Sequence, residues 1–161
     1  MLLGYCAGAE HLELALRAGC DYLEMSFTSV ADMDRAHYDQ TLEKVRGQPL
    51  GVRAMNGFIP GRYPLCAMED FSAVLDFVNK GMNRARRLGT EIVVFGSGAA
   101  RRIPQGMDRE QAWQRLARFI SAAASLAESR GIRIAIEPLC YAECNCVNTL
   151  AQAKELADRA A

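Results

Sequence analysis

The sequence predicts an α/β fold built on a parallel β-sheet. Five times along its 161 residues, a short apolar run suited to a strand is followed by a longer segment with helical periodicity. Alternation of this kind is typical of parallel sheets with right-handed crossovers. The units follow one another without a linker or a low-complexity tract, so residues 1–161 are expected to form one domain.

Strands are predicted where short β-branched or otherwise apolar runs lie between turn residues. Taken in order, these runs cover residues 2–5, 21–25, 50–55, 91–95 and 132–136. The fourth run is continuously apolar, which predicts a strand that is buried on both faces, and the fifth strand is expected to have a buried character as well. Parallel strands place their carboxyl ends at one edge of the sheet, so the loops that follow them should lie together.

Helices are predicted where apolar residues recur at intervals of three and four. The clearest pattern runs from Phe71 to Ala85 and stops at Gly89. Asp108 and Thr149 are each followed three residues later by Gln, which is the spacing of a capping box at a helix N-terminus. In order, the expected helices cover about 12–19, 31–46, 71–89, 108–126 and the segment from 149 onward.

The fifth strand ends in a carboxylate. Isoleucines at alternate positions lead to Glu137, and Pro138 then stops the strand. In α/β architectures the carboxyl ends of the strands face the ligand, so Glu137 is a candidate for metal binding or proton transfer. The alternative is a strand-terminal Glu that is paired with a neighbouring Arg.

Several segments, in this order and spacing, resemble a known family, the xylose isomerase-like TIM barrels of the sugar phosphate isomerase/epimerase group. The segments are Gly4-Tyr5-Cys6, Gly19-Cys20-Asp21-Tyr22-Leu23-Glu24, Asn56-Gly57-Phe58-Ile59-Pro60-Gly61, the stretch from Val93 to Pro104, and Ile136-Glu137-Pro138-Leu139 with Glu143-Cys144-Asn145. Relatives include tagatose- and psicose-type ketose 3-epimerases and hydroxypyruvate isomerases. The resemblance implies a (β/α)8 barrel. Because a full barrel takes about 250 residues, the chain is expected to supply about the first five βα units.

The resemblance also implies the chemistry. In this family a divalent ion (Mn, Mg or Co) is held by ligands from strands five to eight, and two Glu residues move a proton between adjacent carbons of a ketose or hydroxy-carbonyl substrate. Glu137 matches the first of these, as metal ligand and catalytic residue; its companions would lie beyond Ala161, so residues 1–161 alone are expected to be inactive. Glu143 matches a carboxylate that binds substrate. The chain departs from the family at Cys140 and Tyr141, where Asn and Arg are usual.

Further substrate-binding candidates lie where strands end: Tyr5, Asn56, Phe58, Ser97 and Arg101. Ser97 stands between two glycines, which suggests that the backbone there approaches a ligand closely, with Arg101 as a charged donor. The alternatives are a tight loop whose arginines pair with surface acids and, for Tyr5 and Phe58, side chains that belong to the core.

The amino-acid composition limits the classes of partner and function that the chain is expected to have. Nineteen basic residues balance 19 acidic ones, which argues against nucleic acid as a partner, and no apolar run is long enough for a membrane span. A cytoplasmic location and free cysteines are therefore expected, with a sugar or sugar phosphate as ligand and a homo-oligomer as an open option. The alternative functions are a non-catalytic barrel remnant or binding module and an endonuclease IV-like DNA repair barrel. An endonuclease IV-like barrel needs several zinc-binding histidines, and this chain has only two, His11 and His37.

Overall fold

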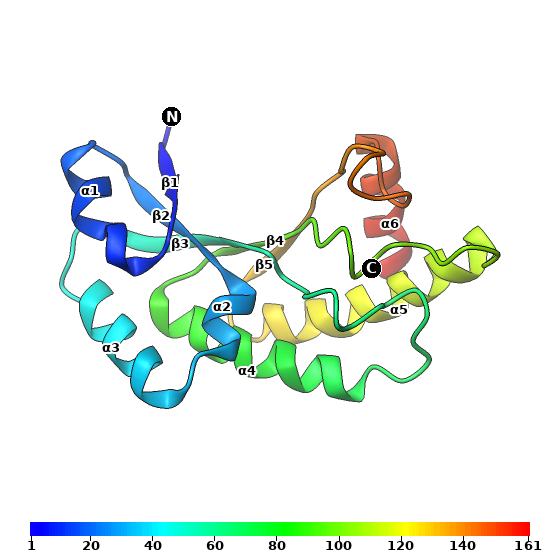
Figure 1. Cartoon of the computed structure of the whole chain (residues 1–161), viewed down its shortest axis with the longest axis horizontal. Helices are drawn as coiled ribbons and strands as arrows, with labels where there is room; N and C mark the ends of the chain where they lie inside the picture. Colours follow the sequence, from blue (N-terminus) through cyan, green and yellow to red (C-terminus); the bar gives the residue numbers. More distant parts are fainter.

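Five parallel strands form one sheet in the computed structural model, which describes residues 1–161, and their spatial order is their sequence order (Figure 1). This confirms the predicted α/β fold, and a sequential order of parallel strands is that of the (β/α)8 barrel that the family resemblance implies. The strands β1 and β5 lie at the two edges of the sheet. Their bounds are β1 (Gly4–Cys6), β2 (Tyr22–Ser26), β3 (Gly51–Asn56), β4 (Ile92–Phe95) and β5 (Arg133–Ile136).

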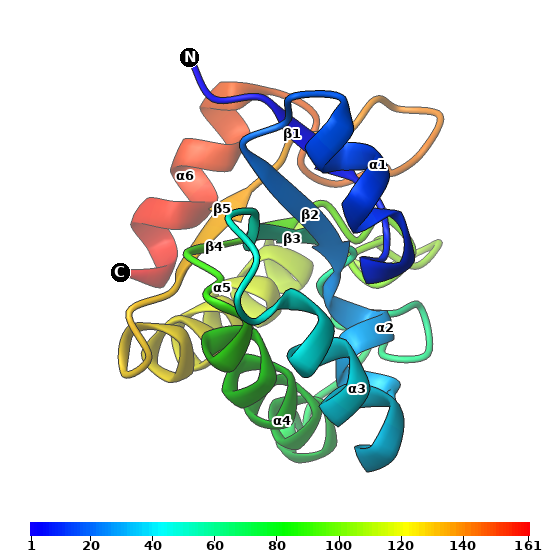
Figure 2. The same ribbon diagram turned by 90° about the vertical axis from the view of Figure 1, so that its left-hand side faces the viewer.

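The helices cover one face of the sheet and its ends, and the two long helices α4 and α5 run beneath β3, β4 and β5 (Figures 1 and 2). None of the helices is long and apolar enough to cross a lipid bilayer. Their bounds are η1 (Ala9–His11), α1 (Leu12–Arg17), α2 (Phe27–Asp32), α3 (Arg35–Val45), α4 (Ser72–Leu88), α5 (Arg109–Glu128) and α6 (Leu150–Ala160).

Both predicted capping residues begin helices. The Asp108 carboxylate accepts a hydrogen bond from the backbone N–H of Gln111 at 2.9 Å, and the Thr149 hydroxyl accepts one from Gln152 at 3.2 Å. Each bond satisfies one of the N–H groups that have no partner inside the helix. These caps fix the starts of α5 and α6, and with them the ends of the loops that precede these helices.

The helix expected over 31–46 is confirmed only from Arg35 to Val45, as α3, and the residues before it form a separate short helix, α2. Ser26, the last residue of β2, caps α2 through its hydroxyl, and Asp34 caps α3 in the same way. The break lies at Met33, whose extended ψ of 143° is incompatible with a continuous helix. The sequence signal was ambiguous because the aromatic and β-branched residues of α2 have strand propensity as well.

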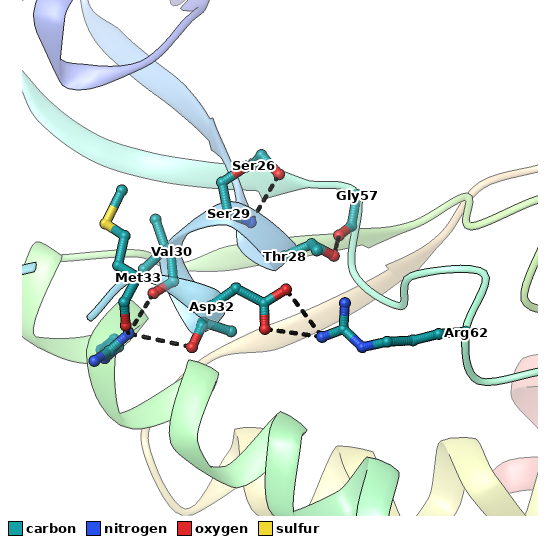
Figure 3. Close-up of polar contacts among 10 residues, drawn as sticks. Ser26, Thr28, Ser29, Val30, Asp32, Met33, Gly57 and Arg62 are labelled. Carbon is teal, nitrogen blue, oxygen red and sulfur yellow. Dashed lines mark hydrogen bonds and ion pairs between the residues drawn. The ribbon is translucent and has the colours of Figure 1, made fainter. Parts of the chain in front are cut away.

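The short helix α2 is fixed to its neighbours by polar contacts at both ends (Figure 3). The Thr28 hydroxyl donates to the carbonyl oxygen of Gly57, just after β3, at 2.6 Å, and Asp32 pairs with both of its oxygens to Arg62. At its C-terminus, Arg84 of α4 donates to the carbonyl oxygens of Val30 and Met33. The helix therefore holds the loop that leaves β3.

Burial on both faces was predicted for β4 and a buried character for β5, and the structure contradicts both. Val93 and Phe95 of β4 are buried against the helices, whereas Ile92 and Val94 on the other face are only half-buried. In β5, Arg133 and Ala135 are exposed. The apolar runs have the composition of strands inside a closed barrel, but in residues 1–161 no further strands or helices cover this second, concave face.

Candidate functional site

The concave face carries a row of small and polar side chains at the carboxyl ends of the strands. The strand register pairs Cys6 of β1 with Glu24 of β2, and Ser26 of β2 with Asn56 of β3. Paired residues of parallel strands point to the same face, and side chains alternate along each strand. The same alternation places Glu137, two residues beyond Ala135 of β5, on this face.

A hydrogen-bonded cluster joins the first three strands. The Asn56 amide donates from Nδ2 to the Glu24 carboxylate at 2.9 Å and to the Cys6 sulfur at 3.0 Å. A cavity of about 490 Å³ lies beside this cluster, and its outer wall includes His37 and Lys44 of α3. The cluster fixes the orientation of the Asn56 amide, and the cavity is large enough for a small polar molecule.

Glu137 lies over Gly96, at the other end of the row. A Cβ atom built on Gly96 would collide with Oε2 of the Glu137 carboxylate, so the absence of a side chain at position 96 makes room for that carboxylate. The Glu137 side chain is exposed, and none of the ion pairs of the chain includes it. The alternative of a Glu that is paired with a neighbouring Arg is therefore not what the structure shows.

Two arginines tie the β4 exit loop (residues 96–108) to the β5 exit loop (residues 137–149). Arg101 is fully buried and donates to the carbonyl oxygens of Phe95 at 2.9 Å and of Glu137 at 2.6 Å. Arg102 donates to the carbonyl oxygen of Glu143 at 2.6 Å. Because Arg101 binds the backbone of Glu137 itself, it fixes the point from which the Glu137 side chain projects.

The remaining candidates Ser97 and Glu143 lie in these two loops. Ser97 has a positive φ of 40°, uncommon for a residue with a side chain, and its hydroxyl accepts a hydrogen bond from the backbone N–H of Ile59 at 2.9 Å. The exposed Glu143 carboxylate accepts from the Cys140 thiol at 3.3 Å, within its own loop. Ser97 thus links the β3 and β4 exits, and Glu143 stands on the β5 exit loop.

Three sequence-based candidates do not lie on the open concave face. Tyr5 alternates with Cys6 in β1 and points to the opposite face, where its ring meets His11 edge-on. Phe58 is fully buried among aromatic core residues, with its ring 4.9 Å from that of Phe27. The Arg101 guanidinium is occupied by backbone carbonyls. The expectation that these three contact a substrate is corrected accordingly.

Two residues of the row were missed from the sequence. Cys6 could have been found by applying the alternation of the strand to β1, which puts Cys6 rather than Tyr5 on the side of Glu24. Gly96 was noted only as one of the two glycines beside Ser97 that suggest a close approach of the backbone to a ligand. Its proximity to Glu137 depends on the pairing of β4 with β5, and no local pattern shows that pairing.

The family resemblance implies a divalent metal, for which Glu137 is the one candidate ligand in residues 1–161. Within residues 1–161 no three His, Cys, Asp or Glu side chains gather closely enough to hold a metal ion. Mg2+ and Mn2+ prefer about six oxygen or nitrogen ligands, and Glu137 alone supplies too few. The donor set of residues 1–161 therefore does not make a metal site by itself.

Gly96→Ala tests the packing of Glu137 directly. We expect the added methyl group to displace the Glu137 carboxylate while the free energy of unfolding changes by less than about 1 kcal/mol, because the obstructing atom ends a flexible side chain. A crystal structure of the variant and a urea titration measure the two effects. Gly51→Ala is the matched control, since a Cβ there meets no atom within 4 Å. An unmoved Glu137 in the Gly96→Ala protein would contradict this description of the site.

Comparison with known proteins agrees with this geometry. The profile of the family described as "Xylose isomerase-like TIM barrel" matches residues 12–161. The chain belongs to this family. A search of curated proteins gives no significant match.

Solved structures of several xylose isomerase-like barrels share the fold of the chain at low sequence identity. A D-psicose 3-epimerase with D-tagatose, from Clostridium cellulolyticum H10, superposes with a TM-score of 0.83 at 16% identity and is matched over 99% of this chain and 60% of its own. An AP endonuclease, family 2, from Brucella melitensis superposes with a TM-score of 0.77 at 20% identity, and the match covers 99% of this chain and 65% of that protein. The IOLI protein with a bound zinc atom superposes with a TM-score of 0.73 at 20% identity, and the match covers 99% of this chain and 59% of that protein.

These coverages show that the chain spans about 60% of the length of the structures that it matches. At these identities the likeness shows the fold alone. It agrees with the expectation of a (β/α)8 barrel truncated to its first five βα units, in which the concave face of the sheet corresponds to the inside of the barrel.

Proposed function

We propose that residues 1–161 form the N-terminal part of an isomerase or epimerase that moves a proton between adjacent carbons of a ketose or hydroxy-carbonyl compound, a sugar or sugar phosphate. Glu137 is the proposed catalytic residue, and Asn56, Ser97 and Glu143 are proposed to bind substrate. The observation that carries the proposal is the placement of Glu137: an exposed carboxylate without an ion pair, at the carboxyl end of β5, on the concave face of a xylose isomerase-like barrel.

In the proposed reaction Glu137 acts as a general base. A carbon-bound proton next to a carbonyl group is acidic enough for removal by a well-placed carboxylate, and such a group contributes roughly 10²- to 10⁴-fold to the rate. Glu137 would take this proton at a carboxylate oxygen. Arg101 donates to the backbone carbonyl oxygen of Glu137, and the absence of a side chain at Gly96 leaves room for the Glu137 carboxylate. The orientation of this carboxylate toward a substrate would therefore be set before the substrate binds.

The cluster of Cys6, Glu24 and Asn56 would bind the part of the substrate that does not react. The Asn56 Nδ2 is held by two acceptors, which leaves its carbonyl oxygen to accept from a substrate hydroxyl. Hydroxyl-rich ligands need such alternating donors and acceptors. The D-psicose 3-epimerase with D-tagatose is a relative in fold whose ligand has this chemistry, and it supports a ketose as the first substrate to test.

Turnover is proposed to need strands beyond β5. In the family, further carboxylates and a His from strands six to eight would complete a divalent metal site (Mn, Mg or Co) around Glu137, and the bound ion would supply polarisation of substrate carbonyl and hydroxyl oxygens. The same strands would supply the second acid or base that returns the proton. Residues 1–161 by themselves are proposed to be inactive and to bind these ions only weakly.

The endonuclease-type alternative receives less support. The AP endonuclease match shows the shared fold, but no observation at the concave face favours DNA over a sugar. The chain as a whole carries no net charge, whereas DNA binding rests on an excess of positive charge.

A substrate screen tests the proposed function. The tested protein continues residues 1–161 with three further βα units, from the coding sequence that follows or from a structural relative, and its folding is checked by circular dichroism. Incubation with Mn2+ and D-fructose, D-tagatose or D-psicose, analysed by chromatography, should show the epimer of at least one ketose. A folded protein that converts no ketose, ketose phosphate or hydroxypyruvate would leave the non-catalytic binding module as the better account.

A further inference from the structure

The β5 exit loop, which carries Glu143, is closed at its base by hydrogen bonds between its two ends. The Asn148 amide donates from Nδ2 to the carbonyl oxygens of Leu139 and Cys144, each at 2.8 Å. The backbone N–H of Leu139 also donates to the carbonyl oxygen of Val147 at 3.0 Å. Because these bonds join the start of the loop to its end, they fix the path of its backbone.

The tip of this loop is a tight turn that holds the backbone of Glu143 from two sides. The carbonyl oxygen of Cys140 accepts hydrogen bonds from the backbone N–H groups of Glu143 at 3.0 Å and of Cys144 at 3.1 Å. Arg102 of the β4 exit loop donates to the carbonyl oxygen of Glu143 at 2.6 Å. The Glu143 side chain is exposed, however, so packing against the core does not set the direction of its carboxylate.

One side-chain contact orients this carboxylate. The Cys140 thiol donates from Sγ to Oε2 of Glu143 at 3.3 Å, and no ion pair of the chain includes Glu143. A protonated thiol is a donor and an ionised carboxylate can only accept, so the two groups suit each other. Since the thiol occupies Oε2, the second oxygen of the carboxylate, Oε1, remains able to accept from a ligand.

An exposed glutamate that has no such contact populates several side-chain rotamers. A ligand that binds it must select one of them, and the lost rotamer freedom weakens binding. A neighbouring donor that already holds the carboxylate in one orientation removes part of this cost before the ligand arrives. The Cys140 thiol, three residues away across a turn whose backbone is fixed, is placed to do this for Glu143.

We propose that Cys140 is a positioning residue for substrate binding: its thiol holds Oε2 of Glu143, so that Oε1 is directed to accept a hydrogen bond from a substrate hydroxyl. The proposal rests on the proposed function, in which Glu143 binds the substrate. Cys140 acts through Glu143 and not on the reacting carbons, so it contributes equally to the binding of substrate and transition state. Loss of such an interaction raises KM and leaves kcat unchanged.

The orientation of Glu143 can be measured in the 161-residue protein, without turnover. NMR three-bond couplings of the Glu143 side chain report how many χ1 rotamers it populates. We expect one dominant rotamer in the parent protein, several in Cys140→Ala, and one again in Cys140→Ser, whose hydroxyl is also a donor. An unchanged single rotamer in Cys140→Ala would overturn the proposal, because something other than the thiol would then hold the carboxylate.

Ketose kinetics of the protein with the completed barrel test the consequence for binding. Cys140→Ala should raise KM about three- to tenfold, the loss expected for one hydrogen bond, with kcat unchanged. Cys140→Ser should return KM to the parent value. Cys20→Ala is the control, since this half-buried free thiol precedes β2 and lies at the opposite end of the strands. A parent KM in Cys140→Ala, or a fall in kcat alone, would contradict the positioning role.

A double-mutant cycle shows whether Cys140 acts through Glu143. In a Glu143→Ala background the thiol has no carboxylate to hold, so Cys140→Ala should cause no further rise in KM. Independent, additive effects of the two substitutions would mean that the thiol contacts the substrate itself, and would overturn the proposal. If the completed barrel converts no ketose at all, the proposed function fails, and the rotamers of Glu143 in the 161-residue protein still decide whether Cys140 orients it.

Discussion

Glu137→Gln should abolish turnover in the protein that carries residues 1–161 together with the strands that complete the barrel. The amide is close in size to the carboxylate but cannot accept a proton, so the base of the proposed reaction is lost. We expect the rate constant for ketose conversion to fall by roughly 10²- to 10⁴-fold or more. Ketose epimerisation measured by chromatography at saturating substrate gives this ratio.

The control for this change is Glu128→Gln. Glu128 is the exposed last residue of α5, so it presents a carboxylate that is likewise open to solvent but lies away from the concave face. This variant should retain the activity of the parent protein. An active Glu137→Gln enzyme with unchanged rate constants would show that the chemistry belongs to another residue.

Arg101→Lys should cost more stability than any conservative surface change in this chain. The planar guanidinium donates to the carbonyl oxygens of Phe95, Glu137 and Val147 from one buried position. A lysine ammonium is a compact donor that cannot reach all three, so buried carbonyls lose their partners. We expect the free energy of unfolding to fall by about 3 kcal/mol, as measured by urea denaturation of the 161-residue protein.

The neighbouring Arg102→Lys provides the comparison. Arg102 is exposed and makes one hydrogen bond, to the carbonyl oxygen of Glu143, which a lysine can also make. We expect a change of less than about 1 kcal/mol there. Equal effects of the two substitutions would mean that the buried contacts of Arg101 do not hold the β4 and β5 exit loops together.

Much of the fold could be predicted because it rests on local patterns. The α4 pattern from Phe71 and the caps at Asp108 and Thr149 follow from short-range periodicity and hydrogen bonding, and the structure confirms them. The short helix α2 was missed because its residues suit a strand equally well. The half-buried face of β4 and the exposed face of β5 could not be predicted either, since their sequences suit a closed barrel.

The site was harder to predict because it depends on pairing between distant strands. Glu137 could be found from its place at the end of an apolar strand. Arg101 was assigned by charge to a substrate, yet the structure uses it to bind backbone carbonyls, and a sequence pattern does not separate these uses of an arginine. Gly96 acquires its place beside Glu137 only through the pairing of β4 with β5.

The most direct test of the central claim is solvent deuterium exchange into a ketose, because it reports proton transfer to carbon whether or not an epimer accumulates. The 161-residue chain and the protein with the completed barrel are each incubated with Mn2+ and the ketose in D2O, and the loss of the proton on the carbon next to the carbonyl is followed by NMR. The account predicts exchange by the completed barrel, its loss in Glu137→Gln, and none by residues 1–161 alone. Exchange that survives Glu137→Gln, or that the 161-residue chain catalyses equally fast, would contradict it.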